Sequence, residues 1–235
     1  TTSCIVASIL QHSSLQFSAF LGGISANLAS NYYYQEAEGE HFSISEADEF
    51  DRSFLHLNPQ YAVITSTDAD HLDIYGKKET IEATYQQFAG LVKSNVFYAL
   101  HKCKINAGVS YSATHKDAVY TADNVVVKPQ GTEFDFVHNG KTIIEKLYLN
   151  IPGVYNLENA IGASAMCLAA GVDKDAIRQG LAQFKGIKRR FEFIVRNEEA
   201  VYIDDYAHHP SELEALIESV KALYPTKKIT AVFQP

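Results

Sequence analysis

The stretch from residue 61 to residue 100 decides the fold class: it reads YAVITS at 61–66, KETIEATYQQFAGLVKS at 78–94 and NVFYAL at 95–100. The first and last segments are short, apolar and rich in β-branched or aromatic residues, which is typical of strands buried on both faces. The middle segment spaces its apolar residues near the helical period and contains no Pro or Gly before Gly90, which predicts a helix. A strand, a helix and a strand in this order predict parallel strands with a right-handed crossover, so the fold class is α/β.

The flanking sequence extends this sheet on both sides. Towards the N-terminus, residues 3–11 predict a helix and HFSIS at 41–45 predicts a further strand. Towards the C-terminus, residues 124–151 alternate apolar and polar side chains around Asn139-Gly140, a pair that favours a tight hairpin turn. We therefore expect a mostly parallel central sheet that continues into an antiparallel meander.

A domain boundary is expected near residue 188. Two helices, at 156–171 and 174–184, are followed by the basic connector KGIKRRFEF at 185–193. We expect a first, ATP-binding domain over 1–188 and the beginning of a Rossmann-like α/β domain over 189–235. The elements expected in that second domain are a strand at 201–204, a helix from Pro210 to about Leu223 and a strand at 228–233.

Composition and charge exclude several classes of protein. The net charge is −8 and the pI is near 5.6, which argues against nucleic acid as a partner because such sites are usually basic. No apolar run approaches the ~18 residues that suggest a membrane helix. The three cysteines are scattered and form no C-x-x-C pair, which fits free thiols in a reducing compartment, so we expect a cytoplasmic protein. The oligomeric state is left open.

Acidic side chains follow two of the expected strands. The loop after 41–45 carries Glu46 and three further acids, and the loop after 61–66 carries three aspartates and His71. Carboxylates at the carboxyl ends of parallel strands lie where α/β folds bind ligands, and Mg²⁺ prefers such oxygens together with water and phosphate. A solvated acidic loop and a helix-capping histidine are the alternatives, and spacing alone does not decide between them.

Two further motifs combine polar side chains with helix starts. In NLENA, Asn156 is expected to be an N-cap residue and Asn159 lies one turn later, so the pair either caps a helix or reads a nucleobase or ribose edge. In DDYAHHP at 204–210, Pro210 suits the first turn of a helix, and a helix N-terminus attracts anions. His208 could then donate to a phosphate oxygen, and Asp205 could accept from a ribose hydroxyl.

Together these motifs resemble the Mur ligase family. EADEFDRSFLHLNP, DADHLDIYG, NLENAIGASA, GIKRRFE and DDYAHHPSE occur in that family's order and at about its spacing, across essentially the whole chain. The resemblance implies an ATP- and Mg²⁺-dependent ligase of peptidoglycan precursor synthesis, with a UDP-sugar domain, a central ATPase domain and a Rossmann-like amino-acid domain. The branch of the family that the motifs resemble most joins L-alanine to UDP-N-acetylmuramate through an acyl phosphate.

The resemblance also implies roles for individual residues. Glu46 and His71 would hold Mg²⁺, and Asn156 and Asn159 would contact the adenine side of ATP. Ribose and phosphates would be contacted by Arg190, Asp205, Tyr206 and His208. We count Glu46, His71 and His208 as the catalytic candidates.

Three departures from the family pattern accompany the resemblance. The phosphate loop G-T-x-G-K-T is not in the chain, and the match suggests that Thr1 lies just after its lysine. The expected arginines beyond VFQP are also missing, and Tyr155 stands where the family usually has His. We therefore expect the polypeptide alone to be inactive. The alternative functions are a recycling ligase that attaches a tripeptide to the same sugar nucleotide, and a non-catalytic nucleotide-binding module.

Overall fold

The strand–helix–strand unit predicted from residues 61–100 is present. The computed structural model describes residues 1–36, 38–68 and 75–233, and in it β4 (Tyr61–Ile64), α3 (Lys78–Leu91) and β5 (Asn95–Ala99) follow one another. β4 and β5 are parallel, with Tyr61 opposite Asn95. The helix ends three residues and the second strand one residue earlier than expected, and the prediction of a parallel α/β core is confirmed.

The sheet continues through four more strands: β6 (Val109–Tyr111), β7 (Tyr120–Lys128), β8 (Gly131–His138) and β9 (Lys141–Leu149). Neighbours follow chain order from β4 to β9, parallel as far as β7 and antiparallel from β7 to β9. Asn139 and Gly140 join β8 to β9 with φ of 50° and 72°, the left-handed values that a tight hairpin turn requires. The antiparallel meander is therefore confirmed, although β7 begins before residue 124.

Alternate side chains of β4 and β5 enter two separate cores. Ile64 and Val96 pack with Phe88 of α3 and with Phe54 of a short 3₁₀ helix, Ser53–His56. Phe97 and other side chains of opposite parity belong to the main core on the other face of the sheet. This alternation with a period of two residues explains why both strands are apolar throughout.

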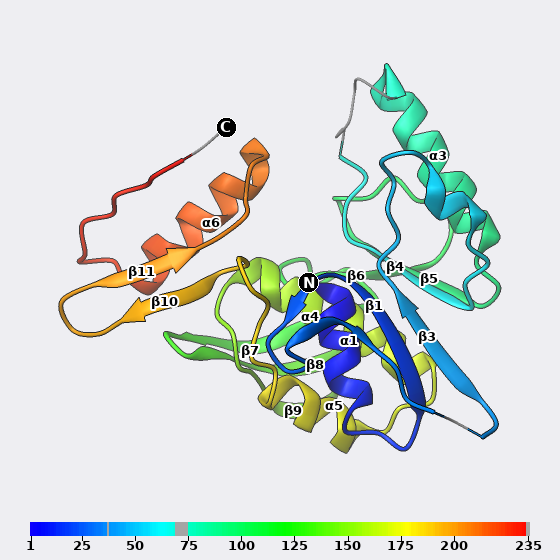
Figure 1. The fold of residues 1–235 in the computed structure, drawn as a ribbon, viewed down its shortest axis with the longest axis horizontal. Coiled ribbons are helices and arrows are strands. Elements are labelled where there is room, and N and C mark those ends of the chain that lie inside the picture. The colour runs from blue at the N-terminus through cyan, green and yellow to red at the C-terminus, as the bar shows by residue number, and fades with distance from the viewer. Residues whose placement is uncertain (37, 69–74, 234–235) are drawn as a thin grey trace.

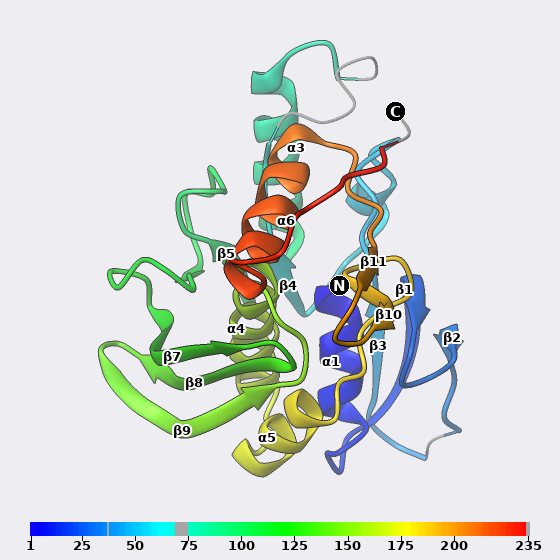
Figure 2. The same cartoon turned by 90° about the vertical axis from the view of Figure 1, so that its left-hand side faces the viewer.

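Three helices fill the main core: α1 (Thr2–Leu10), α4 (Val154–Ala169) and α5 (Lys174–Ala182). Figure 2 shows α4 beside the β7–β9 strands and α1 next to α4. α1 and α5 approach closely, because the Ser8 hydroxyl donates to the Gly180 carbonyl at 2.8 Å and a Cβ at Gly180 would overlap the backbone of Ile9. All three helices lie close to their predicted ranges.

A second sheet lies beside α1 and was not predicted as such. It consists of β2 (Ser30–Tyr33), β1 (Gln16–Ser25) and β3 (His41–Ser45), with β1 central, antiparallel to β2 and parallel to β3. The strand at 41–45 is confirmed, but its expected place next to the strand at 61–66 is wrong. Within the described part of the chain, β3 pairs with β1 alone and β4 with β5 alone, because a cleft separates β3 from β4.

The C-terminal region forms a hairpin and a helix, drawn in orange in Figure 1. β10 (Glu192–Arg196) and β11 (Val201–Asp204) are antiparallel, and α6 spans Pro210–Leu223 as predicted. The strand expected at 228–233 is wrong: this segment is irregular, and Val232 is 98% exposed. A strand requires a neighbouring edge, and the described residues form no ladder with this segment. Among the described helices, none is both long enough and apolar enough to cross a bilayer.

Candidate functional site

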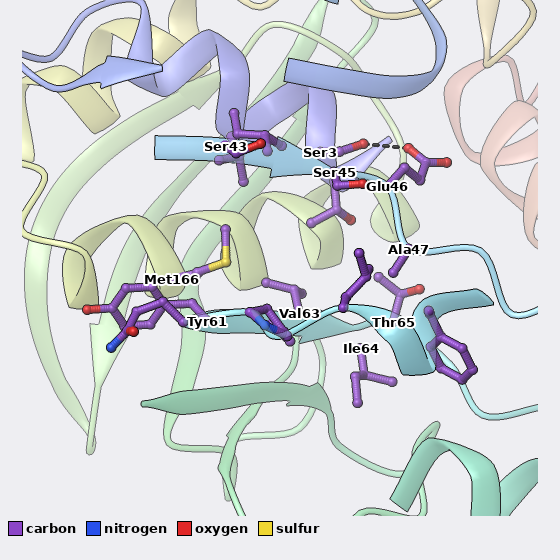
Figure 3. A pocket seen from close by; sticks show the side chains of 18 of the residues that line it. Ser3, Ser43, Ser45, Glu46, Ala47, Tyr61, Val63, Ile64, Thr65 and Met166 are labelled. Carbon is purple, nitrogen blue, oxygen red and sulfur yellow. Dashed lines mark hydrogen bonds between the residues drawn. The ribbon is translucent and has the colours of Figure 1, made fainter. Parts of the chain in front are cut away.

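A cleft of about 1320 Å³ separates β3 from β4, and Figure 3 shows its walls. The labels in Figure 3 place Ser43, Ser45 and Glu46 along one wall, and Tyr61, Val63 and Thr65 along the other, in the same direction. Both strands therefore direct their carboxyl ends to the same end of the cleft. Polar side chains gather at that end, and those that line it include Thr1, Thr2, Ser3, Glu46, Arg190, His209 and Glu212.

Glu46 is fixed by contacts with α1 and β1. One carboxylate oxygen accepts hydrogen bonds from the Ser3 hydroxyl and from the Gly22 N–H, the latter at 3.3 Å. Burial raises the pKa of Glu46, whereas these two donors and the positive charge of Arg190 lower it, and the pKa lies below its ordinary value. Glu46 is therefore an ionised carboxylate, positioned to accept a cation.

Arg190 brings a positive charge to the same end of the cleft. Its guanidinium lies 3.8 Å from a carboxylate oxygen of Glu212 and 5.8 Å from the centre of the Tyr206 ring. Arg189 approaches the same ring at 4.8 Å. A guanidinium held by an aromatic face and a carboxylate is well placed for an anionic oxygen such as phosphate. The cleft thus combines a carboxylate that can bind a cation, Glu46, with a guanidinium that can bind an anion, Arg190.

Asp205 joins the basic connector at 185–193 (the linker) to the loop before α6. Its two carboxylate oxygens accept hydrogen bonds from the N–H groups of Phe191, at 2.7 Å, and Ala207, at 2.8 Å. Burial raises the pKa of Asp205 above its ordinary value, while these N–H groups and Arg190 oppose that shift. The Asp205 carboxylate therefore holds the linker and the loop before α6 in place relative to each other.

His208 and Glu212 organise the start of α6. The Nδ1–H of His208 donates to the Tyr206 carbonyl at 3.1 Å, and one carboxylate oxygen of Glu212 accepts from the His208 N–H at 3.2 Å and the His209 N–H at 3.4 Å. Glu212 lies three residues after the N-cap, His209, which is the spacing of a capping box. The His208 side chain is 57% exposed, so it can reach a ligand at this surface.

Neither of the two asparagines of α4 lines the cleft. Asn156 is buried and its amide donates to the Pro152 carbonyl at 2.7 Å, whereas Asn159 accepts from the Thr2 hydroxyl at 3.2 Å. The expectation that Asn156 caps the helix is wrong, because α4 begins two residues earlier and its N-cap is Gly153. Asn159 connects α4 to the start of α1.

Tyr155, the departure from the family pattern, lies beside the same linker. Burial raises the pKa of its hydroxyl well above the ordinary value, and the charge of Asp205 adds to this effect. Its ring centre is 6.3 Å from that of Phe191. A neutral aromatic side chain here packs the linker against α4.

Most of the predicted site residues gather at one end of the cleft. Glu46 and Arg190 line it directly, and Asp205, Tyr206 and His208 are linked to it through Arg190 and Glu212. His71 lies outside the described residues. Sequence reasoning missed Ser3, Gly22 and Glu212. Glu212 was recognisable from its capping-box spacing, whereas the contacts of Ser3 and Gly22 with Glu46 depend on tertiary structure.

Comparisons with known proteins agree with this architecture. Residues 1–167 match the Mur ligase middle domain, and residues 189–235 match the domain described as Mur ligase, glutamate ligase domain. The chain is 44% identical over 235 residues to the UDP-N-acetylmuramate–L-alanine ligase of Flavobacterium johnsoniae, covering all of this chain and 51% of that protein. It is 40% identical over 243 residues to the enzyme of the same name from Porphyromonas gingivalis, covering all of this chain and 53% of that protein.

A solved structure shows the same fold. The UDP-N-acetylmuramate–alanine ligase of Thermotoga maritima superposes with a TM-score of 0.80 at 27% identity, covering 97% of this chain and 53% of that one. The chain thus spans about half the length of the relatives that it matches.

Proposed function

This chain belongs to the Mur ligase family, and from that premise we propose that it is the ATP-binding part of a ligase that joins L-alanine to UDP-N-acetylmuramate. Identities of 38–44% with several relatives of that name support this choice of substrates. The observation that carries the proposal is that Glu46 and Arg190, two predicted ligands from distant parts of the chain, line the same end of one cleft. The three free thiols support a cytoplasmic location.

In the proposed reaction, a carboxylate oxygen of the sugar nucleotide attacks the γ-phosphorus of ATP, and ADP leaves. The amine of L-alanine then attacks the carbonyl carbon of the acyl phosphate, phosphate leaves with the bonding electrons, and the amine loses a proton as the amide forms. Such phosphoryl transfers depend mainly on positioning and on neutralising charge. The side chains around the cleft fit these two tasks.

The residues fit Mg²⁺ because Glu46 is an ionised carboxylate that directly follows β3 and lines the cleft. We propose that Glu46 and His71 hold Mg²⁺, which would neutralise phosphate charge when bound. Arg190 would contact phosphate oxygens, and His208 would donate to them from the loop before α6. Tyr206 and Asp205 would contact the ribose side directly or hold that loop in place. Asn156 and Asn159 would border the adenine.

The test uses the protein extended to the length of its relatives. We expect phosphate release from Mg²⁺-ATP with UDP-N-acetylmuramate to depend on added L-alanine. Release with the cell-wall tripeptide alone would identify a recycling ligase, and no release from a folded protein would identify a nucleotide-binding module. Glu46→Gln should lower kcat by about a hundredfold, since the proposed Mg²⁺ would lose a charged ligand and with it the neutralisation of phosphate charge in the transition state. Glu199→Gln, at an exposed position that does not line the cleft, is the matched surface control.

A further inference from the structure

A second cluster of possible ligands lies on the loops after β5 and β6. His101 follows β5, and His115 and Asp117 lie between β6 and β7. Each offers a ligand atom, and these atoms all lie within 4.8 Å of one another. The Nε2 of His101 is 3.9 Å from a carboxylate oxygen of Asp117, and the rings of His101 and His115 meet edge to face with centres 4.4 Å apart.

The backbone that carries these side chains is held by hydrogen bonds. The Leu100 N–H donates to the Tyr111 carbonyl at 2.9 Å, which joins the ends of β5 and β6. The Ser112 hydroxyl accepts from the His115 N–H at 3.2 Å, and the His115 carbonyl accepts from the Ala118 N–H at 3.3 Å. The two loops are therefore fixed next to each other, while the three side chains remain exposed and can rotate.

We propose that His101, His115 and Asp117 form a binding site for a transition-metal ion such as Zn²⁺. Two imidazoles and one carboxylate suit Zn²⁺ and Co²⁺, whereas Mg²⁺ and Ca²⁺ prefer oxygen ligands alone. Zn–N and Zn–O bonds of about 2.0–2.2 Å in a tetrahedron put ligand atoms about 3.3 Å apart, so the widest separation in the present cluster, 4.8 Å, needs to contract by about 1.5 Å. Water would occupy the fourth position.

This site is separate from the cleft, since none of its three residues lines it. A bound ion would nevertheless act on α4. Lys102, adjacent to His101, pairs with the buried carboxylate of Glu158 at 2.8 Å, and Glu158 also accepts from the Ala113 N–H at 3.1 Å. The same two loops thus hold the first turns of α4, so an ion that links the loops should stabilise the helix that carries Asn156 and Asn159.

The test is a titration of chelator-treated protein with Co²⁺, read from its visible absorption, followed by competition with Zn²⁺ in calorimetry. We expect one Co²⁺ per chain at this site, displaced by Zn²⁺, and a Zn²⁺-dependent rise in the melting temperature. His101→Ala and His115→Ala should each weaken binding at least tenfold, and Asp117→Asn by less. His56→Ala, which removes an exposed histidine elsewhere, should leave binding unchanged.

Circular dichroism of each variant separates loss of the site from loss of the fold. Co²⁺ binding with unchanged affinity and stoichiometry in the folded His101→Ala/His115→Ala double variant would overturn the proposal and place the ion elsewhere. Equal losses in His56→Ala and His101→Ala would also overturn it, since that result indicates non-specific binding to surface histidines. The proposal would likewise be overturned if the unaltered chain bound no Co²⁺ stoichiometrically.

Discussion

Glu46 owes its position to a glycine on the neighbouring strand. A Cβ at Gly22 would overlap the carboxylate of Glu46, and the N–H of Gly22 donates to that carboxylate. We predict that Gly22→Ala displaces the Glu46 side chain and brings its pKa back towards the ordinary value of 4.5. The fold should survive, since the overlapped atoms are the flexible end of a side chain. A carbon-detected NMR titration of the glutamate carboxyl measures the shift.

The same pKa predicts a sign for the pH dependence of stability. A carboxylate whose folded pKa is depressed stabilises the fold above its unfolded pKa, and this contribution disappears as the pH falls through the folded pKa. The difference in unfolding free energy between the unaltered chain and Gly22→Ala should therefore narrow below about pH 4. Gly90→Ala is the control, since nothing lies near a Cβ there and the residue is in α3. If this difference in unfolding free energy widened in acid, the depressed pKa of Glu46 would not be the cause of the stabilisation.

Arg190 lies near two carboxylates whose pKa values are shifted in opposite directions. The pKa of Glu46 is lowered and that of Asp205 is raised, yet the charge of Arg190 lowers both. We predict that Arg190→Gln raises both pKa values, because each carboxylate loses a neighbouring positive charge. The same NMR titration measures both shifts in one experiment. Arg196→Gln should change neither, and a shift of Glu46 alone would show that Arg190 does not couple the linker to the cleft.

At the scale of elements, the start of α6 depends on Glu212. Its carboxylate accepts two N–H groups before the helix and lies near Arg190. We predict that Glu212→Ala lowers the unfolding free energy of the C-terminal unit by about 1 kcal/mol, the usual cost of losing a helix cap. Amide exchange of the α6 residues measures this change. Glu218→Ala removes the same charge far from the cap, and an equal effect there would refute the capping role.

The elements themselves show what local sequence can predict. α6 was predicted to within a residue because Pro210 marks its first turn, and the hairpin after β8 because Asn139-Gly140 fixes its turn. β1 was missed because the sequence does not alternate cleanly there: Phe17, Ala19 and Leu21 are buried, but the exposed position between the last two is Phe20. The segment at 228–233 has strand composition but no strand structure, because pairing is decided by a partner and not by propensity.

The site followed the same rule. Glu46, Arg190 and the loop at 204–210 were identifiable from motifs: Glu46 directly follows a strand, Arg190 lies in the basic connector, and the loop joins a strand to a helix. Two hydrogen bonds could not be predicted from the sequence, because they join residues far apart in the chain. They run from the Phe191 N–H to Asp205 and from the Ser3 hydroxyl to Glu46. From the sequence, the strands at 41–45 and 61–66 were expected to be neighbours in one sheet. In the structure a cleft lies between them.

At the scale of the whole molecule, the cleft leaves two strand edges facing each other. The Glu46 N–H donates to the Phe20 carbonyl, and the Ser94 N–H donates to the Gln60 carbonyl. Because peptide groups alternate in direction along a strand, the N–H groups of Ser43 and Ser45 in β3, and of Tyr61 and Val63 in β4, face the cleft. Their neighbours of opposite parity face β1 and β5.

We predict that these four amides exchange with solvent at least tenfold faster than those of Phe42, Ile44, Ala62 and Ile64 in the 235-residue chain. Two edges running in the same direction can both pair with one added parallel strand, since each offers a full set of donors and acceptors. In protein extended to the length of its relatives, we therefore expect the four amides to slow, while those of β8, already paired on both sides, stay unchanged. Hydrogen exchange read by NMR or mass spectrometry measures both effects.

The concentration dependence of these rates identifies the occupant of the cleft. Fast exchange in the short chain at all concentrations, with slowing only in the longer protein, would indicate a strand from the same polypeptide. Slow exchange that appears with dimers of the short chain would indicate pairing between copies at the exposed edges. Equal rates for both sets of amides in monomeric short chain would contradict the prediction, since the edges would then already be paired.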